Sequence, residues 1–285
     1  MSKVAIVTDS TATIPAELMR GYPVQVVPLQ VIWGDETFLD GLDIQPADFY
    51  QRLKHTKVMP TTSQPSPAAF IKVYQKLLDE GYSILSVHIS AALSGTVDSA
   101  LQAKAHFTNA PIEVVNSQLT SMAMGFPVML AARAAAQNAT LQECRVLVER
   151  ATEQSGVCFV VNTLEFLHRG GRIGGAAAFL GTALNLKPLL ELREGRIEAI
   201  ERVRTMGKAV DRLIALTEER IGTRTPIRLA ALHAHAPAEA QELLARARDR
   251  FGLTDVSETF IADISPVLGT HTGPGAMGLA YMAGM

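Results

Sequence analysis

Short apolar runs alternate with amphipathic segments along the first half of the chain. Four runs rich in β-branched residues predict strands, at 4–7, 24–33, 83–90 and 112–117. A helical spacing of apolar residues predicts helices over 45–54, 67–80, from about 96, over 122–137 and over 141–154. Pro28 interrupts the second run and indicates an edge strand or a bulge, because proline cannot donate a ladder hydrogen bond. This order predicts an α/β fold with three layers, a parallel sheet between two layers of helices.

The second half of the chain has a different pattern. A strand at 157–161 is followed by runs at 188–192 and 196–203, which flank the turn Arg193-Glu194-Gly195 and predict an antiparallel hairpin. A helix over 207–221, a strand over 227–233, a helix over 238–250 and a strand over 256–263 follow. We therefore expect a smaller α+β domain and place the boundary near Gly156. The N-terminal α/β domain would span 1–155 and the C-terminal α/β domain 156–285.

Composition narrows the class of protein. Hydrophobic residues make up 48% of the 285 residues, and 26 Lys and Arg against 28 Asp and Glu give a net charge of −2. A nucleic-acid or permanent anionic-membrane binder would show a basic excess, so neither is expected. Cys144 and Cys158 have no metal-site or C-x-x-C spacing and are expected in the core. Without a secretory leader or a run of about 18 apolar residues, a soluble cytoplasmic protein is expected.

Common catalytic signatures are absent. The chain has no phosphate loop, no G-x-S-x-G elbow, no H-E-x-x-H and no kinase signature. A G-x-G-x-x-G pattern at Gly273, Gly275 and Gly278 is followed by only seven residues, so we do not expect a dinucleotide unit there. His233 and His235 could form a metal pair on one face of a strand. Because no carboxylate or cysteine cluster stands near them, we favour ordinary histidines at a strand end.

Three hydroxyl-rich segments follow predicted strands or open predicted helices. They are Thr8-Asp9-Ser10-Thr11, the segment 61–67 with Thr62 and Ser63, and the segment 90–96 with Ser94 and Gly95. In parallel sheets ligands bind outside the carboxyl ends of the strands, and helix N-termini offer free N–H groups to an anion. The segments therefore predict a site for a carboxylate or a phosphate. The alternative is that their residues only cap helices and form turns.

Two glycine-rich segments in the second half carry basic residues. Arg169 and Arg172 stand among the glycines of the segment 168–175, and an arginine side chain can bind an anion with two hydrogen bonds. His271 precedes the turn Thr272-Gly273-Pro274-Gly275. A solvated basic loop and an inert turn are the alternatives to an anion site.

Together these motifs resemble, in order and spacing, those of the DegV family of bacterial fatty-acid-binding proteins. They are Thr8-Asp9-Ser10, Thr61-Thr62-Ser63-Gln64-Pro65, Leu93-Ser94-Gly95-Thr96, Gly170-Gly171-Arg172-Ile173 and His271-x-Gly273-Pro274-Gly275. The resemblance covers essentially the whole chain. It implies that a fatty acid lies buried between an N-terminal α/β domain and a smaller C-terminal one. It also implies that a separate kinase subunit, using ATP and magnesium, converts the acid to an acyl-phosphate, and that contact with a membrane for lipid exchange is transient.

The resemblance implies roles for individual residues. Thr62 and Ser94 match hydroxyls that bind the lipid carboxylate, and His271 matches a histidine close to it. Arg172 matches an arginine implicated in acyl-phosphate formation with the kinase. The flanking residues of the head-group site are Ser63 and Gly95. The family often has an aspartate where this chain has Asn116, whose role the resemblance does not assign.

Two other functions stay open at this point. Ser94 could be the nucleophile of an acyl hydrolase or acyltransferase, although no Asp–His pair can be assigned to it from the sequence. The chain could also bind another small carboxylate or a phosphorylated metabolite. Because the chain has no phosphate loop and no metal-binding acid cluster, we expect a substrate-presenting subunit, not a free-standing enzyme. Four basic residues are candidates for docking the kinase, with solvated surface charges as the alternative: Arg169, Arg202, Arg204 and Lys208.

Overall fold

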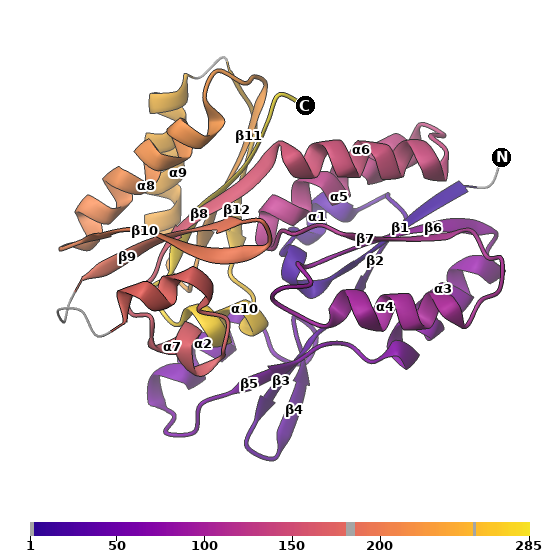
Figure 1. Cartoon of the computed structure of the whole chain (residues 1–285), viewed down its shortest axis with the longest axis horizontal. Coiled ribbons are helices and arrows are strands. Elements are labelled where there is room, and N and C mark those ends of the chain that lie inside the picture. The colour runs from indigo at the N-terminus through magenta and orange to yellow at the C-terminus, as the bar shows by residue number, and fades with distance from the viewer. Residues whose placement is uncertain (1–2, 181–185, 253–254) are drawn as a thin grey trace.

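A computed structural model describes residues 3–180, 186–252 and 255–285 of the chain. The first sheet is parallel, with β1 (Lys3–Asp9), β2 (Val24–Val27), β6 (Tyr82–His88) and β7 (Ile112–Asn116) in the order β2-β1-β6-β7. Helices α3 (Pro67–Asp79) and α4 (Thr96–Ala105) cover one face, and α5 (Ser121–Ala136) and α6 (Leu141–Glu153) cover the other (Figure 1). The three-layer α/β arrangement predicted from the apolar runs is confirmed.

The second sheet is mixed and has six strands. They are β8 (Ser155–Val160), β9 (Lys187–Arg193), β10 (Arg196–Val203), β11 (Ile227–His233), β12 (Val256–Asp263) and β13 (Met277–Ala283), in the order β10-β9-β8-β13-β11-β12. Helices α8 (Met206–Ile221) and α9 (Pro237–Phe251) cover its outer face (Figure 1). Strands β9 and β10 form the predicted hairpin, which turns at Glu194 and Gly195. The division of the chain at residue 155 stays a prediction.

A third, small antiparallel sheet lies below the other two in Figure 1. It consists of β3 (Gln30–Trp33), β4 (Glu36–Leu39) and β5 (Thr61–Ser63), and α2 (Pro46–His55) joins β4 to β5. The prediction of one strand over 24–33 was wrong. The chain leaves the first sheet at Pro28, so β2 ends as an edge strand and β3 begins a different sheet.

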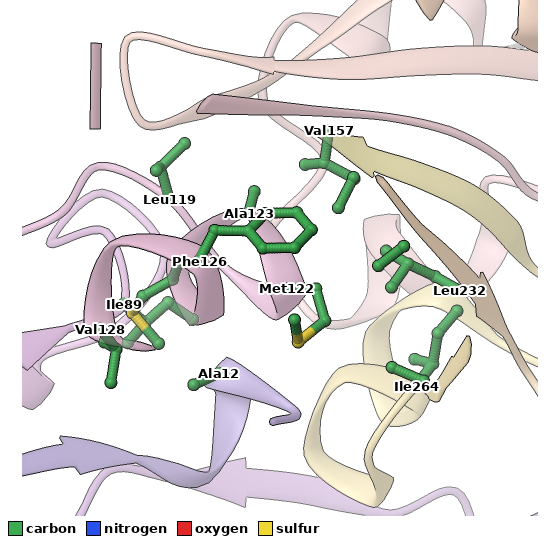
Figure 2. Close-up of a cluster of buried hydrophobic side chains, with 14 of the residues drawn as sticks. Ala12, Ile89, Leu119, Met122, Ala123, Phe126, Val128, Val157, Leu232 and Ile264 are labelled. Carbon is green, nitrogen blue, oxygen red and sulfur yellow. The ribbon is translucent and has the colours of Figure 1, made fainter. Parts of the chain in front are cut away.

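Helix α5 lies between the two large sheets. It packs on β1 of the first sheet and on β13, β8 and β11 of the second. Twelve of its sixteen residues are buried, because both sides of the helix face protein. This position explains the long apolar run around Pro127, which reads from the sequence as an almost uniformly hydrophobic helix. Figure 2 shows side chains from α5 meeting Val157 and Leu232 of the second sheet.

Short elements complete the connections. They are η1 (Ser10–Ala12), α1 (Ala16–Met19), α7 (Glu165–Arg169), η2 (Gly174–Phe179) and α10 (Pro266–Thr272).

Cys144 and Cys158 are buried free thiols, as expected. Thr140 caps α6 in a reciprocal capping box with Glu143. None of the helices in the described part of the chain is long and apolar enough to cross a membrane.

Candidate functional site

A cavity of about 890 Å³ lies where the second sheet, α10 and the carboxyl end of the first sheet meet. Most of its lining side chains are apolar, and they come from the second sheet, from α7 and α10 and from loops that flank the strands: Leu29, Ile89, Leu93, Val157, Phe159, Leu167, Leu192, Ile197, Leu232, Ile264, Val267 and Leu268. A smaller polar set also lines it: Thr62, Ser63, Gln64, Ser94, Thr120, Ser121, Arg172, His271 and Thr272. The cavity thus suits a long apolar ligand with a polar group.

Strand β5 positions Thr62. The segment 61–67 was predicted as a helix-opening loop, but residues Thr61 to Ser63 form a strand on β3, with Thr62 opposite Val31. Helix α3 begins only at Pro67, where Ser66 is the N-cap. Because side chains alternate along a strand, Thr62 is half-buried and faces the cavity while Thr61 is exposed. The Thr62 Oγ1 lies 2.8 Å from His271 Nε2.

His271 projects from the last turn of α10. The N-cap of this helix is Ser265, whose side chain accepts a hydrogen bond from the N–H of Leu268. The Nδ1 atom of His271 is buried without a hydrogen-bond partner. This nitrogen lies so close to Gly170 that a Cβ atom added to the glycine would stand 2.1 Å from it. Burial, together with the charge of Arg172, lowers the pKa of His271 to about 4, so its ring is neutral near pH 7.

Arg172 connects the two halves of the chain at this site. Its Nε donates a hydrogen bond to the carbonyl of Leu93, at 3.0 Å, and its Nη1 donates to the carbonyl of Gly170, at 2.6 Å. Leu93 belongs to the loop between β6 and α4, which also carries Ser94. The Ser94 and Thr96 hydroxyls are 2.9 Å apart. The structure therefore brings together Thr62, Ser94, Arg172 and His271 from four separate segments.

The flanking residues are placed differently from one another. Ser63 lines the cavity, whereas Gly95 does not. Gly95 instead leaves room for Gln64, because a Cβ atom at Gly95 would lie 2.9 Å from Gln64 Nε2. Gln64 lines the cavity but was not singled out from the sequence. Its place directly after Thr62 and Ser63 in one motif was the available signal.

A second, outer cavity of about 620 Å³ adjoins the first. Thr62, Arg172 and His271 line both cavities. The other residues of the outer cavity include Phe166 and Arg169, and Arg169 forms an ion pair with Glu165 at 2.6 Å. The polar side chains therefore separate an apolar interior from an outer depression.

A buried Asp–His pair exists, but it does not reach Ser94. Asp9 Oδ2 lies 3.1 Å from His88 Nδ1, and His88 Nε2 lies 2.6 Å from the hydroxyl of Ser86. All three side chains are completely buried, and Tyr74 donates a hydrogen bond to Ser86 from the other side. This arrangement gives Ser94 no base, so no observation favours the hydrolase alternative.

The remaining polar positions hold the backbone in place. Asn116 Oδ1 accepts hydrogen bonds from the N–H groups of Ala91 and Gln118, both at 3.1 Å. Strand β11 ends at His233, which agrees with the favoured interpretation of ordinary histidines at a strand end, and His235 lies beyond the strand. His235 stacks on Tyr50. Within the described ranges, no three His, Cys, Asp or Glu side chains are grouped so that they could hold a metal ion.

Comparison with known proteins identifies the family. The model of the DegV family of uncharacterised proteins matches residues 3–284. The chain belongs to the DegV family. A DegV domain-containing protein of Streptomyces coelicolor is 41% identical over 278 residues, which cover 97% of each chain. The resemblance inferred from the five motifs is thereby confirmed.

Solved structures of DegV proteins share the fold. A fatty-acid-binding DegV family protein from Thermus thermophilus superimposes with a TM-score of 0.89 at 39% identity, over 99% of both chains. DegV from Bacillus subtilis, described as a fatty acid binding protein, gives a TM-score of 0.89 at 31% identity. This superposition covers 99% of the present chain and 100% of the other.

Proposed function

We propose that this DegV protein binds a long-chain fatty acid in the 890 Å³ cavity, with the carboxylate at Thr62, Ser94 and His271. The observation that carries the proposal is a mostly apolar cavity whose polar residues include this cluster. Each methylene buried there contributes about 0.8 kcal/mol, so an acyl chain of ordinary length supplies a large driving force. The fatty-acid-binding relatives at 31% and 39% identity support the same ligand class.

The head group needs hydrogen-bond donors, because a buried carboxylate is costly without them. His271 is neutral, and its unpartnered Nδ1 is best left without a proton, because a buried N–H with no acceptor is costly. The proton then sits on Nε2 and is donated to Thr62 Oγ1. This arrangement leaves the hydroxyl proton of Thr62 free for the carboxylate. Ser94 supplies a second hydroxyl from the opposite loop.

The outer cavity supports a second part of the proposal, in which the bound acid is presented to a separate kinase subunit. The partner would supply ATP and Mg²⁺, since this chain has no phosphate loop. A carboxylate oxygen would attack the γ-phosphorus of ATP, ADP would leave, and an acyl-phosphate would form. Arg172 lines both cavities and would offset the negative charge that accumulates during this transfer.

Organic extraction of the purified protein, followed by mass spectrometry, tests the ligand. We expect about one fatty acid per chain, either retained from the host or taken up from an added mixture. Uptake of a polar metabolite in its place would support the alternative of a small carboxylate or phosphate ligand. Failure to take up any fatty acid would reject the proposal.

Replacement of Arg172 tests presentation. Arg172→Ala should change fatty-acid affinity only slightly but lower the rate of acyl-phosphate formation with the kinase subunit by about a hundredfold or more. Arg172→Lys is the matched variant, because it keeps the charge but not the planar fork of donors. Acyl-phosphate formation at the normal rate by Arg172→Ala would exclude the assigned role.

A further inference from the structure

A small pocket lies close to the cavity assigned to the fatty acid, and its lining combines apolar side chains with the ion-paired Arg133, Arg228 and Glu258. Met122, Phe126 and Met129 line it from α5, and Phe260 and Met282 line it from the second sheet. None of these five residues lines the larger cavity. Nothing in the proposed function uses this space.

Strand register places the two cavities one after the other along the same face of the second sheet. One row across neighbouring strands consists of Phe159, Gly278 and Leu232, and all three line the large cavity. A parallel row four residues further along the strands consists of Met282, Arg228 and Glu258, and all three line the small cavity. Side chains on one face repeat every second residue, so the rows are about 13 Å apart, with one row between them.

The intermediate row contains little side-chain volume at its centre. It consists of Val157, Ala280, Ala230 and Phe260. Val157 lines the large cavity and Phe260 the small one, whereas the two alanines line neither. Two methyl groups alone do not fill the layer between the sheet and α5. A side chain from the helix must therefore close the space over Ala280 and Ala230.

Met122 is the residue of α5 that we consider for this position. The helix packs over β13, β8 and β11. Ser121 lines the large cavity, and Met122, the next residue, lines the small one and is completely buried. Figure 2 shows the Met122 side chain extending from the helix in the layer that it shares with Val157, Leu232 and Ile264, all residues of the large cavity. Met122 therefore stands at the junction of the two cavities.

We propose that Met122 closes the tail end of the fatty-acid cavity and sets the longest acyl chain that fits. The inference rests on the proposed fatty-acid function and adds a residue that determines specificity. Replacing the thioether with a small side chain would join the cavities and extend the tail site toward Phe126. Each additional buried methylene is worth about a fourfold gain in affinity. An acid two carbons beyond the wild-type limit should therefore bind about fifteenfold better once the space opens.

The test is a chain-length series of saturated acids from 12 to 24 carbons. Delipidated protein is titrated by displacement of a fluorescent fatty acid. Wild-type affinity should rise with length to a limit and then fall. In Met122→Ala the limit should move by at least two carbons, and the first acid beyond the wild-type limit should bind about tenfold or more tighter than it binds the wild type. Met129→Ala is the matched control, because it shortens a methionine on the same cavity away from the junction, and its limit should not move.

The outcomes separate the two proposals. An unchanged limit in a Met122→Ala protein that still binds palmitate would overturn the role of Met122, and so would an equal shift in Met129→Ala. If Met122→Ala does not fold, Met122→Val removes less volume and should shift the limit in the same direction, and no shift there would have the same meaning. Wild-type protein that binds no acid of any length would instead reject the proposed function.

Discussion

At the scale of single residues, the hydroxyls of Thr62 and Ser94 carry the head-group hypothesis. The double variant Thr62→Ala, Ser94→Ala should bind fatty acid much more weakly while keeping its fold. A hydrogen bond to a charged group contributes about 1.5–3 kcal/mol, so the loss of two predicts a decrease in affinity of at least about a hundredfold. Fluorescence displacement measures this change directly.

The control for this prediction lies on the same small sheet. Thr37→Ala removes an exposed threonine from β4, the neighbour of β3, and should leave the affinity unchanged. Wild-type affinity in the double variant would show that the carboxylate binds elsewhere. A loss in both proteins would point to damage to the sheet and not to lost hydrogen bonds.

The sequence indicated which residue types form the site but not how they hold one another. Thr62 and His271 are separated by 209 positions, and their hydrogen bond depends on the packing of α10 on β5. No local pattern indicates that Arg172 donates to a backbone carbonyl of the loop that carries Ser94. Gly95 leaves room for Gln64 because two distant segments come into contact. A single sequence does not show such contacts.

At the scale of elements, the predicted strands and helices are those with long, uniform patterns. Strand β6 and helix α3 follow apolar periodicity closely. The capping box of α6 consists of two residues that are near each other in the sequence, Thr140 and Glu143. Strand β5 was missed because it has three residues, all with hydroxyl side chains. Strand β13 was missed because Gly278 and its alanines have low strand propensity, and pairing with β8 and β11 outweighs that preference.

Gly170, the residue that follows α7, lies against His271 of α10. This contact predicts the effect of replacing the glycine with alanine. Gly170 has ordinary helical backbone angles, so alanine fits its conformation. The added Cβ atom would lie 2.1 Å from His271 Nδ1, however, and the ring would have to move. Gly170→Ala should therefore lengthen the bond between Thr62 and His271 and weaken fatty-acid binding about tenfold, the effect of one lost hydrogen bond.

Gly207→Ala is the matched control, because this glycine lies in α8 with no atom within 4 Å of an added Cβ. It should leave binding unchanged and stabilise the helix slightly. Binding by Gly170→Ala at the wild-type affinity would mean that the position of His271 is unimportant for the ligand.

At the scale of the whole molecule, the cavity depends on contacts that join distant parts of the chain. Arg133 of α5 makes a bidentate ion pair with Glu258 of β12, and the Ser90 hydroxyl donates to the carbonyl of Gly195 in the β9–β10 turn. Asp40 makes another buried connection. It accepts hydrogen bonds from Ser10 and Ser265, which follow β1 and precede α10.

Burial raises the pKa of Asp40 to about 6, above its ordinary value of 3.8. The unfolded chain therefore loses this proton at lower pH than the folded chain does. As a result, Asp40 lowers the stability of the folded protein as pH rises from about 4 to about 6. The full difference between the two pKa values corresponds to about 3 kcal/mol. His271 acts in the opposite direction, because its pKa is lowered, and it costs stability as pH falls from 6.5 to about 4.

Asp40→Asn should remove the loss of stability that Asp40 causes as pH rises, and should leave the loss that His271 causes as pH falls. Asparagine can still accept from the N–H of Val267 and can donate to the hydroxyls of Ser10 and Ser265, which rotate to accept. Urea denaturation of delipidated protein between pH 4 and pH 7 should show the stability of the wild type falling relative to the variant as pH rises, by up to about 3 kcal/mol. Asp35→Asn, in the exposed turn between β3 and β4, is the control. Parallel stability curves for wild type and Asp40→Asn would mean that Asp40 titrates alike in both states, and that the hydrogen bonds from Ser10 and Ser265 fully offset its burial.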